Sequence, residues 1–137
     1  MAPPASRRGN GPAKGSGTRA GKRAAERRGR LAETAAAFLL RAKGYRILAR
    51  RLRTPSGEID ILARKGNLLV IVEVKARARR EDAGIALTPR QQQRLTAAAS
   101  WLPRWRPGLT GCDMRFDLIA VSPWRWPRHT PNAWMAM

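Results

Sequence analysis

Two short segments in the middle of the chain carry acidic and basic side chains at a spacing that suits metal-dependent chemistry. The first is Gly57-Glu58-Ile59-Asp60, and the second is Glu73-Val74-Lys75. The dipeptide Gly66-Asn67 lies midway between them and predicts a two-residue turn. The segments are then parts of one β-hairpin, with strands over residues 58–65 and 68–76.

A two-residue turn fixes which residues of the two strands face each other. It places Asp60 opposite Glu73 and Glu58 opposite Lys75, with all four side chains on one face of the hairpin. Directly opposed Cβ atoms lie about 4.5–5.5 Å apart, and like charges at that distance are destabilising. The Asp60–Glu73 pair therefore calls for a compensating charge, which a divalent cation would supply.

These residue types suit hydrolysis of a phosphodiester bond. Carboxylate oxygens hold Mg²⁺ while waters complete its octahedron, and the ion stabilises phosphoryl charge and lowers the pKa of bound water. Asp60 and Glu73 are the candidate ligands, and the Val74 carbonyl could supply another. Lys75 could orient the attacking water or stabilise the developing charge. Glu33 could complete the metal shell or accept a proton, and the cofactor expected is Mg²⁺ or Mn²⁺.

Two alternatives stay open at this point. In a cross-strand ion-pair lattice, the Glu58–Lys75 pair stabilises the hairpin, although the Asp60–Glu73 pair does not. A three- or four-residue loop with a bulge would shift the register by one residue and separate the faces.

The chain of 137 residues fits one domain and has a formal net charge of +19, from 28 Lys and Arg against 9 Asp and Glu. Residues 31–137 hold nineteen of the basic residues and eight of the acidic ones, so the excess is not confined to one terminus. Such a charge favours a nucleic-acid partner, or a basic ribosome-associated role. Candidate nucleic-acid contacts are Arg53, Arg77, Arg79, Arg80 and Arg90.

Other classes of protein are disfavoured by what the chain lacks. Cys112 is the only cysteine and His129 the only histidine, which excludes an intrachain disulfide and a Cys- or His-based zinc cluster. A single cysteine suits the cytosol. No apolar run approaches the roughly 20 residues of a membrane span, so no membrane partner is expected.

The elements around the hairpin follow from apolar spacing and capping residues. A helix is predicted over residues 31–43, with Gly44 as its C′ residue and Glu33 partly enclosed near its start. Residues 1–28 are poor in large apolar side chains and predict a disordered basic arm ahead of a domain at 29–137. A strand is expected over 45–53.

The second half of the chain adds a helix and a strand. Thr88, Pro89 and Gln91 form a helix-start signature, and Pro103 is expected to end that helix. A buried strand is predicted over 115–121. The segment from Ser122 is rich in Pro and Trp and receives no firm assignment. Its tryptophans, interleaved with arginines, suit either base stacking or a core.

The two faces of the hairpin differ in polarity. One face is apolar throughout and must be buried; it carries Ile59, Ile61, Ala63, Val70, Val72 and Val74. The other face is apolar only near the turn, at Leu62, Leu69 and Ile71, and charged at the far end. This pattern predicts a site at the rim of a sheet.

The combination of these motifs resembles the YraN-type family of small bacterial proteins. The resemblance covers about residues 29–134 and rests on the segments Gly57–Asp60 and Glu73–Lys75 with thirteen positions from Asp to Glu. It also includes Gly29 and Glu33 in the first helix, with further matches at Gly44-Tyr45, Arg115-Phe116-Asp117 and Asn132-Ala133-Trp134.

The resemblance implies a restriction-endonuclease-like fold, that is, an α/β domain with a mixed central sheet flanked by helices. The family is similar to PD-(D/E)xK nucleases, including Holliday-junction resolvases, which implies metal and catalytic roles for Glu33, Asp60, Glu73 and Lys75. It also implies a homodimer acting on branched DNA. Two departures stand out: Ile59 replaces the proline usual before the aspartate, and Gln91 stands where a lysine is common. The alternative is a binding protein that keeps the fold without turnover.

Overall fold

A computed structural model describes residues 18–77 and 87–134 of the chain. Its centre is one sheet of five strands in the order β1-β2-β3-β4-β5. The β3–β4 pair is parallel and the other three pairs are antiparallel, so the sheet is mixed. The expected α/β class with a mixed, helix-flanked sheet is confirmed. The strands are β1 (Arg46–Thr54), β2 (Gly57–Lys65), β3 (Leu68–Ala76), β4 (Asp113–Val121) and β5 (Arg128–Trp134).

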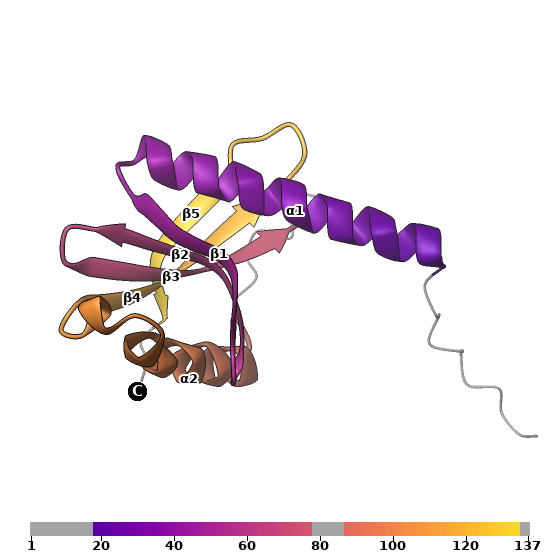
Figure 1. Ribbon diagram of the computed structural model, residues 1–137. Coiled ribbons are helices and arrows are strands. Elements are labelled where there is room, and N and C mark those ends of the chain that lie inside the picture. Colours follow the sequence, from indigo (N-terminus) through magenta and orange to yellow (C-terminus); the bar gives the residue numbers. More distant parts are fainter. Residues whose placement is uncertain (1–17, 78–86, 135–137) are drawn as a thin grey trace, which may run out of the picture.

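Two helices cover the two faces of this sheet (Figure 1). Helix α1 (Arg19–Ala42) packs on one face, where Ala36, Ala37 and Leu40 meet strand residues such as Ile61 and Val72. Helix α2 (Pro89–Trp105) packs on the other face. Its buried side chains join apolar residues of the sheet, and this second core contains Ile59, Leu62, Leu69, Ile71, Leu95, Ala98, Leu102 and Phe116.

Helix α1 begins earlier than the sequence predicts. Thr18 caps it by accepting a hydrogen bond from the Gly21 amide at 3.1 Å, and the helix then runs from Arg19. The prediction of a disordered arm over 1–28 is therefore wrong for residues 19–28, while residues 1–17 lie outside the described residues. The Ala, Arg and Lys residues of this stretch are good helix formers, so they extend a helix that is anchored further along by packing.

The C-terminus of α1 agrees with the expectation. The Tyr45 amide donates to the Leu40 carbonyl and the Gly44 amide to the Arg41 carbonyl, which together form a Schellman motif. Gly44 has φ +90°, which explains why a glycine follows the helix here. The motif turns the chain directly into β1.

Helix α2 starts as predicted and ends later. Thr88 and Gln91 form a complete capping box ahead of Pro89. Pro103 was expected to end the helix, but it lies inside α2, which continues to Trp105. Proline lacks an amide donor of its own, but residues after it can still donate, and the Arg106 amide bonds the Leu102 carbonyl at 2.9 Å. A short 3₁₀ helix, η2 (Pro107–Leu109), follows.

The predicted hairpin register is confirmed next to its turn and lost further away. Strands β2 and β3 pair from Lys65–Leu68 to Ile61–Val72 across a two-residue turn at Gly66 and Asn67. The expected pairs Asp60–Glu73 and Glu58–Lys75 do not belong to this ladder. Beyond Ile61, β2 continues beside β1, with Leu52 opposite Ile59, while β3 continues beside β4.

The cause of this divergence is a bend in the β1–β2 ribbon. Arg51 has φ +51°, a conformation that non-glycine residues rarely adopt. Past this point the ribbon turns toward α2 (Figure 1), and a Cβ on Gly57 would lie 2.9 Å from the Arg94 side chain of that helix. Ile59 was expected on the same face as Ile61, but it packs in the core beside α2 because the bend reverses the faces.

Candidate metal centre

Asp60 lies at the point where β2 separates from β3. The Val74 amide of β3 donates to Asp60 Oδ2 at 2.9 Å, so a side chain bridges the strands where the backbone ladder has stopped. This hydrogen bond holds the Asp60 carboxylate at the rim of the sheet, where the sequence predicted the site.

Three carboxylates from two elements converge at this rim. One oxygen each of Glu33, Glu58 and Asp60 lie within 4.8 Å of one another. Glu33 comes from α1 and is 8% exposed, whereas Glu58 is exposed on β2. The separation is close to the span of about 4.2 Å between opposite ligands of an octahedral Mg²⁺ with bonds near 2.1 Å.

Glu73 adds a fourth carboxylate, and its effect is seen in the pKa of Asp60. Burial raises this pKa first, the negative charge of Glu73 raises it further, and the Val74 hydrogen bond lowers it by less. Glu33 also contributes, and the result is a pKa of about 7 for Asp60. The repulsion that the sequence predicts between Asp60 and Glu73 is therefore present although the two residues are not a ladder pair.

Glu73 itself is 5% exposed, and only one of its two carboxylate oxygens has a polar partner among the described residues. Its Oε1 lies 3.2 Å from Lys75 Nζ, while its Oε2 is buried and has no hydrogen-bond partner among the described residues. A buried carboxylate oxygen without a donor is costly. The donor set thus fits a hard cation: several carboxylates, one of them unsatisfied, with an ammonium group alongside.

The expected Glu58–Lys75 pair is not formed. Lys75 pairs with Glu73, and Glu58 lies opposite Arg53 in β1 and close to Glu33 and Asp60. The ion-pair lattice considered from the sequence is therefore wrong in its pairing. The reason is the bend in β2, which carries Glu58 away from β3.

Arg51 is a member of the site that the sequence reasoning missed. Its Nε donates to Glu33 Oε2 at 2.6 Å, and Arg50 lies 4.0 Å from the same oxygen. The hydrogen bond to Glu33 raises the pKa of Arg51. A partial signal was available: the turn that pairs Thr54 with Gly57 also pairs Leu52 with Ile59, which brings the neighbouring Arg51 to the level of Asp60.

The remaining sequence candidates are placed as follows. Arg53 and Arg90 are exposed, while Arg77 is half-buried and its amide donates to the Val121 carbonyl at 2.8 Å. Arg79 and Arg80 lie outside the described residues. The Val74 amide is used by Asp60, and the proposed ligand role of the Val74 carbonyl stays a prediction.

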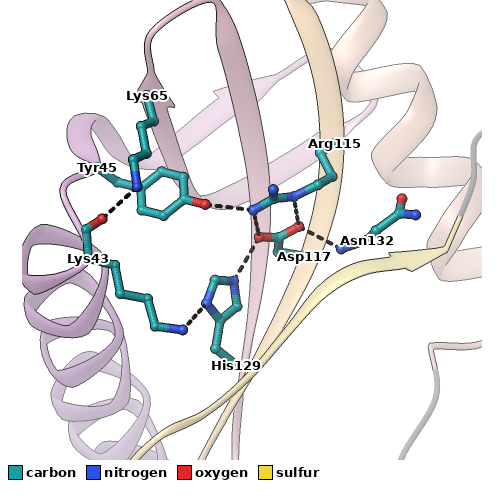
Figure 2. Close-up of polar contacts among 7 residues, drawn as sticks. All are labelled: Lys43, Tyr45, Lys65, Arg115, Asp117, His129 and Asn132. Atoms are coloured by element: carbon teal, nitrogen blue, oxygen red, sulfur yellow. Dashed lines mark hydrogen bonds and ion pairs between the residues drawn. The ribbon is translucent and has the colours of Figure 1, made fainter.

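A second polar cluster, also missed, lies within the sheet around Asp117 (Figure 2). Asp117 is fully buried and receives two hydrogen bonds from Arg115, at 2.7 and 2.8 Å, and one from the Asn132 amide at 2.9 Å. His129 Nε2 lies 2.7 Å from Asp117 Oδ2, and Arg115 also donates to the Tyr45 hydroxyl. An aspartate inside an apolar strand was the signal, because a buried carboxylate requires partners.

The same contacts fix the state of this cluster. Lys43 Nζ lies 2.8 Å from His129 Nδ1, and an ammonium group can only donate, so Nδ1 accepts and Nε2 donates to Asp117. Burial alone would raise the pKa of Asp117. Hydrogen bonds from His129, Arg115 and Asn132 outweigh it and lower the pKa to about 2. The cluster ties the end of α1 and strand β5 to β4.

Comparison with known proteins places the chain in a family. The model of the family described as "Uncharacterised protein family UPF0102" matches residues 32–121. A UPF0102 protein of Parvibaculum lavamentivorans is 51% identical over 134 residues, which cover 98% of this chain and 95% of the relative. The chain belongs to the UPF0102 family.

Other UPF0102 proteins match most of the chain. One from Paramagnetospirillum magneticum is 52% identical over 116 residues, covering 81% of this chain and 89% of the relative. One from Rhodopseudomonas palustris strain BisB5 is 58% identical over 106 residues, covering 77% and 80%. UPF0102 is the YraN-type family that the sequence motifs resembled, so that resemblance is confirmed. Within the described residues, neither helix of this UPF0102 protein is long and apolar enough to cross a membrane.

Proposed function

We propose that this UPF0102 protein binds nucleic acid and hydrolyses phosphodiester bonds with Mg²⁺ or Mn²⁺ at the cluster of Glu33, Asp60, Glu73 and Lys75. The observation that carries the proposal is the convergence of oxygens of Glu33, Glu58 and Asp60 within 4.8 Å of one another, together with the buried, unsatisfied oxygen of Glu73. Burial and the charge of Glu73 raise the pKa of Asp60 in this setting. A protein keeps such an unfavourable concentration of negative charge where it serves a function, and a bound cation would relieve it.

Each residue has a role in this proposal. Asp60, held by the Val74 amide, and Glu73 bind the cation, and the Val74 carbonyl is a further ligand. When bound, the cation supplies Lewis-acid stabilisation of the phosphoryl oxygens and a more acidic water. Lys75, held by Glu73 at 3.2 Å, orients the attacking water or stabilises charge on the phosphate.

Glu33 and Arg51 act together at the other side of the cluster. Glu33 is enclosed on α1 and accepts from Arg51, which holds its carboxylate close to Asp60, where it would complete the metal shell or accept a proton. The exposed Arg51 guanidinium can also contact a phosphate while it remains close to Glu33.

The preferred substrate is DNA, with branched DNA as the first structure to test. The net charge of +19 supports a polyanionic partner, and the exposed Arg53 lies opposite Glu58 at the edge of the cluster. The proposed setting is the cytoplasm, with a homodimer as the proposed assembly. A monomer in light scattering at micromolar concentration would count against the dimer.

A second candidate is a protein that binds DNA or ribosomal RNA without cleaving it. Two observations favour it. The Arg51–Glu33 ion pair at 2.6 Å already neutralises one candidate acid. Gln91, which departs from the lysine that the family resemblance implies, is engaged in a helix cap, because its side chain accepts from the Thr88 amide.

Assays of nucleic-acid cleavage and of nucleic-acid binding separate the two candidates. Wild-type protein is incubated with branched, duplex and single-stranded DNA and with RNA, each with Mg²⁺, Mn²⁺ or EDTA. The matched variants are Asp60→Asn and Lys75→Ala in the cluster and Asp113→Asn at an exposed position of β4. Metal-dependent cleavage that is lost in the first two variants and kept in the third supports the enzyme. Tight binding with no cleavage under either metal supports the second candidate.

A further inference from the structure

We propose that the N-terminal half of α1 is a phosphate-binding arm that holds the nucleic-acid strand leading to the acid cluster. This inference rests on the nucleic-acid part of the proposed function. Residues 19–28 are exposed along their whole length, and the helix projects beyond the sheet into solvent (Figure 1). Residues 19–30 contain six basic side chains and one acidic side chain.

Most of these charges lie on one face of the helix. Arg19, Lys22, Arg23, Arg27 and Arg30 follow the i, i+3, i+4, i+8 and i+11 positions, which share a face. The side chains of Arg23, Glu26, Arg27 and Arg30 together line a hollow of about 310 Å³. We call the five basic residues Arg19, Lys22, Arg23, Arg27 and Arg30 the arm stripe.

The arm stripe leads to the candidate metal centre. The next turn after Arg30 carries Glu33 and Thr34 on the same face. The Thr34 hydroxyl donates to the Arg30 carbonyl at 2.9 Å and accepts from Arg50 at 2.9 Å. Arg50 lies 4.0 Å from Glu33, so basic groups continue without interruption from the arm to the cluster.

The arm is electrostatically unfavourable by itself. Its first turn contains no acidic residue, and cations at a helix N-terminus oppose the macrodipole. Arginines four residues apart, such as Arg19, Arg23 and Arg27, also repel one another. The arm's one described ion pair joins Arg30 to Glu26 at 3.9 Å, with both side chains more than half exposed. A polyanion along the stripe would reverse both penalties, which is why the partner is a phosphate backbone.

The length of the arm sets the extent of the contact. Arg19 and Thr34 are fifteen residues apart on α1, which is about 22 Å along the helix at 1.5 Å per residue. At 3.4 Å per base step along each strand, this corresponds to about six steps of duplex on one side of the cluster. The substrate proposed is therefore a strand that extends several nucleotides to one side of the reacting phosphate.

The salt dependence of binding tests the arm directly. The arm variant is Arg19→Gln, Arg23→Gln, Arg27→Gln and Arg30→Gln together, because glutamine keeps helix propensity. The control variant carries Gln at Arg46, Arg94, Arg104 and Arg106, which are exposed and lie outside α1 and outside the segment of residues 121–123 that packs beside it. A third variant replaces the four arm arginines by Lys. Binding to a 30-base-pair DNA is measured by fluorescence anisotropy at several salt concentrations.

In the arm variant, the slope of log K against log salt should become smaller in magnitude. Each phosphate contact contributes about 0.9 to the slope of log K against log salt, so the slope should fall by about 3–4, with at least tenfold weaker binding at 0.1 M salt. The control variant should change the slope by less than one, and the Lys variant should keep it. Circular dichroism checks that α1 remains helical.

Two results would overturn the inference, and they differ from each other. If the arm and control variants lose the same slope, the arm has no special role, although nucleic-acid binding stands. If the wild type binds neither DNA nor RNA, the proposed function fails and the arm fails with it.

Discussion

The substitution Asp60→Asn should stabilise the metal-free protein at alkaline pH while it removes the response to metal. Asparagine keeps an oxygen that can accept from the Val74 amide, and its amide group can donate to Glu73, so the local geometry is preserved. What changes is the charge: the variant no longer places a second anion beside Glu73.

The size of the effect follows from the pKa of Asp60. Burial and the charge of Glu73 raise it to about 7 in the folded protein, against about 3.9 in an unfolded chain. Between these values the folded state binds more protons than the unfolded state, so stability falls as the pH rises. From pH 5 to pH 8.5 the wild type should lose about 2–3 kcal/mol relative to Asp60→Asn, at 1.36 kcal/mol per pKa unit.

Urea unfolding in EDTA at pH 5 and pH 8.5 measures this difference. Other titrating groups are common to both proteins and cancel in the comparison. The control variant is Asp113→Asn, which removes an exposed carboxylate outside the cluster and should leave the pH dependence unchanged. A gap between wild type and Asp60→Asn that is constant with pH, or that favours the wild type at pH 8.5, would refute the reasoning.

Metal completes the test. At pH 8.5, Mg²⁺ at ten times its dissociation constant should add about 1.4 kcal/mol to the stability of the wild type and nothing to Asp60→Asn. An equal gain in both proteins would show that the cation binds elsewhere.

Two further predictions concern the scaffold. The pKa of Asp117 is lowered to about 2, chiefly because hydrogen bonds from His129 and Arg115 outweigh burial, so the wild type should lose about 2 kcal/mol as the pH falls from 4 to 2. Acid titration of the unfolding midpoint measures this loss, and a flat profile in that range would contradict it. Gly44→Ala should cost about 1–2 kcal/mol because Gly44 has φ +90°. Its control, Gly29→Ala, should stabilise α1 by about 0.5–1 kcal/mol, since no atom lies within 4 Å of the added Cβ; equal effects in urea unfolding would count against this account.

Features that depend on a few neighbouring residues could be predicted from the sequence. The turn at Gly66 and Asn67 set the β2–β3 register as far as Ile61 and Val72. The capping box at Thr88 and the glycine after α1 were likewise local signals, because each is decided by hydrogen bonds within one turn of chain. The convergence of acidic residues at the sheet rim was also predicted, since it follows from strands of known length on either side of a short turn.

The tertiary structure decided how the strands pair beyond Ile61, where local sequence signals no longer determine the register. Whether β2 follows β3 or β1 beyond Ile61 depends on competition between two neighbouring strands and on packing against α2, and no local signal fixes that outcome. The bend at Arg51 carries β2 away from β3, and the Asp60–Val74 hydrogen bond takes the place of the predicted ladder pair. The sequence thus determined which acids and which lysine reach the rim. The fold decided that Arg51 joins Glu33, because only the packed sheet brings β1 to the start of the buried part of α1.

The cluster around Asp117 also shows what the sequence determines and what only the tertiary structure decides. Its members come from the end of α1, from β4 and from β5, up to 89 positions apart in the chain (Lys43 to Asn132). The sequence determined that a carboxylate in a buried strand needs partners, because an unpaired buried charge is too costly to keep. Only the assembled sheet decided that those partners are Arg115, His129 and the Asn132 amide, since strand order alone brings β5 alongside β4.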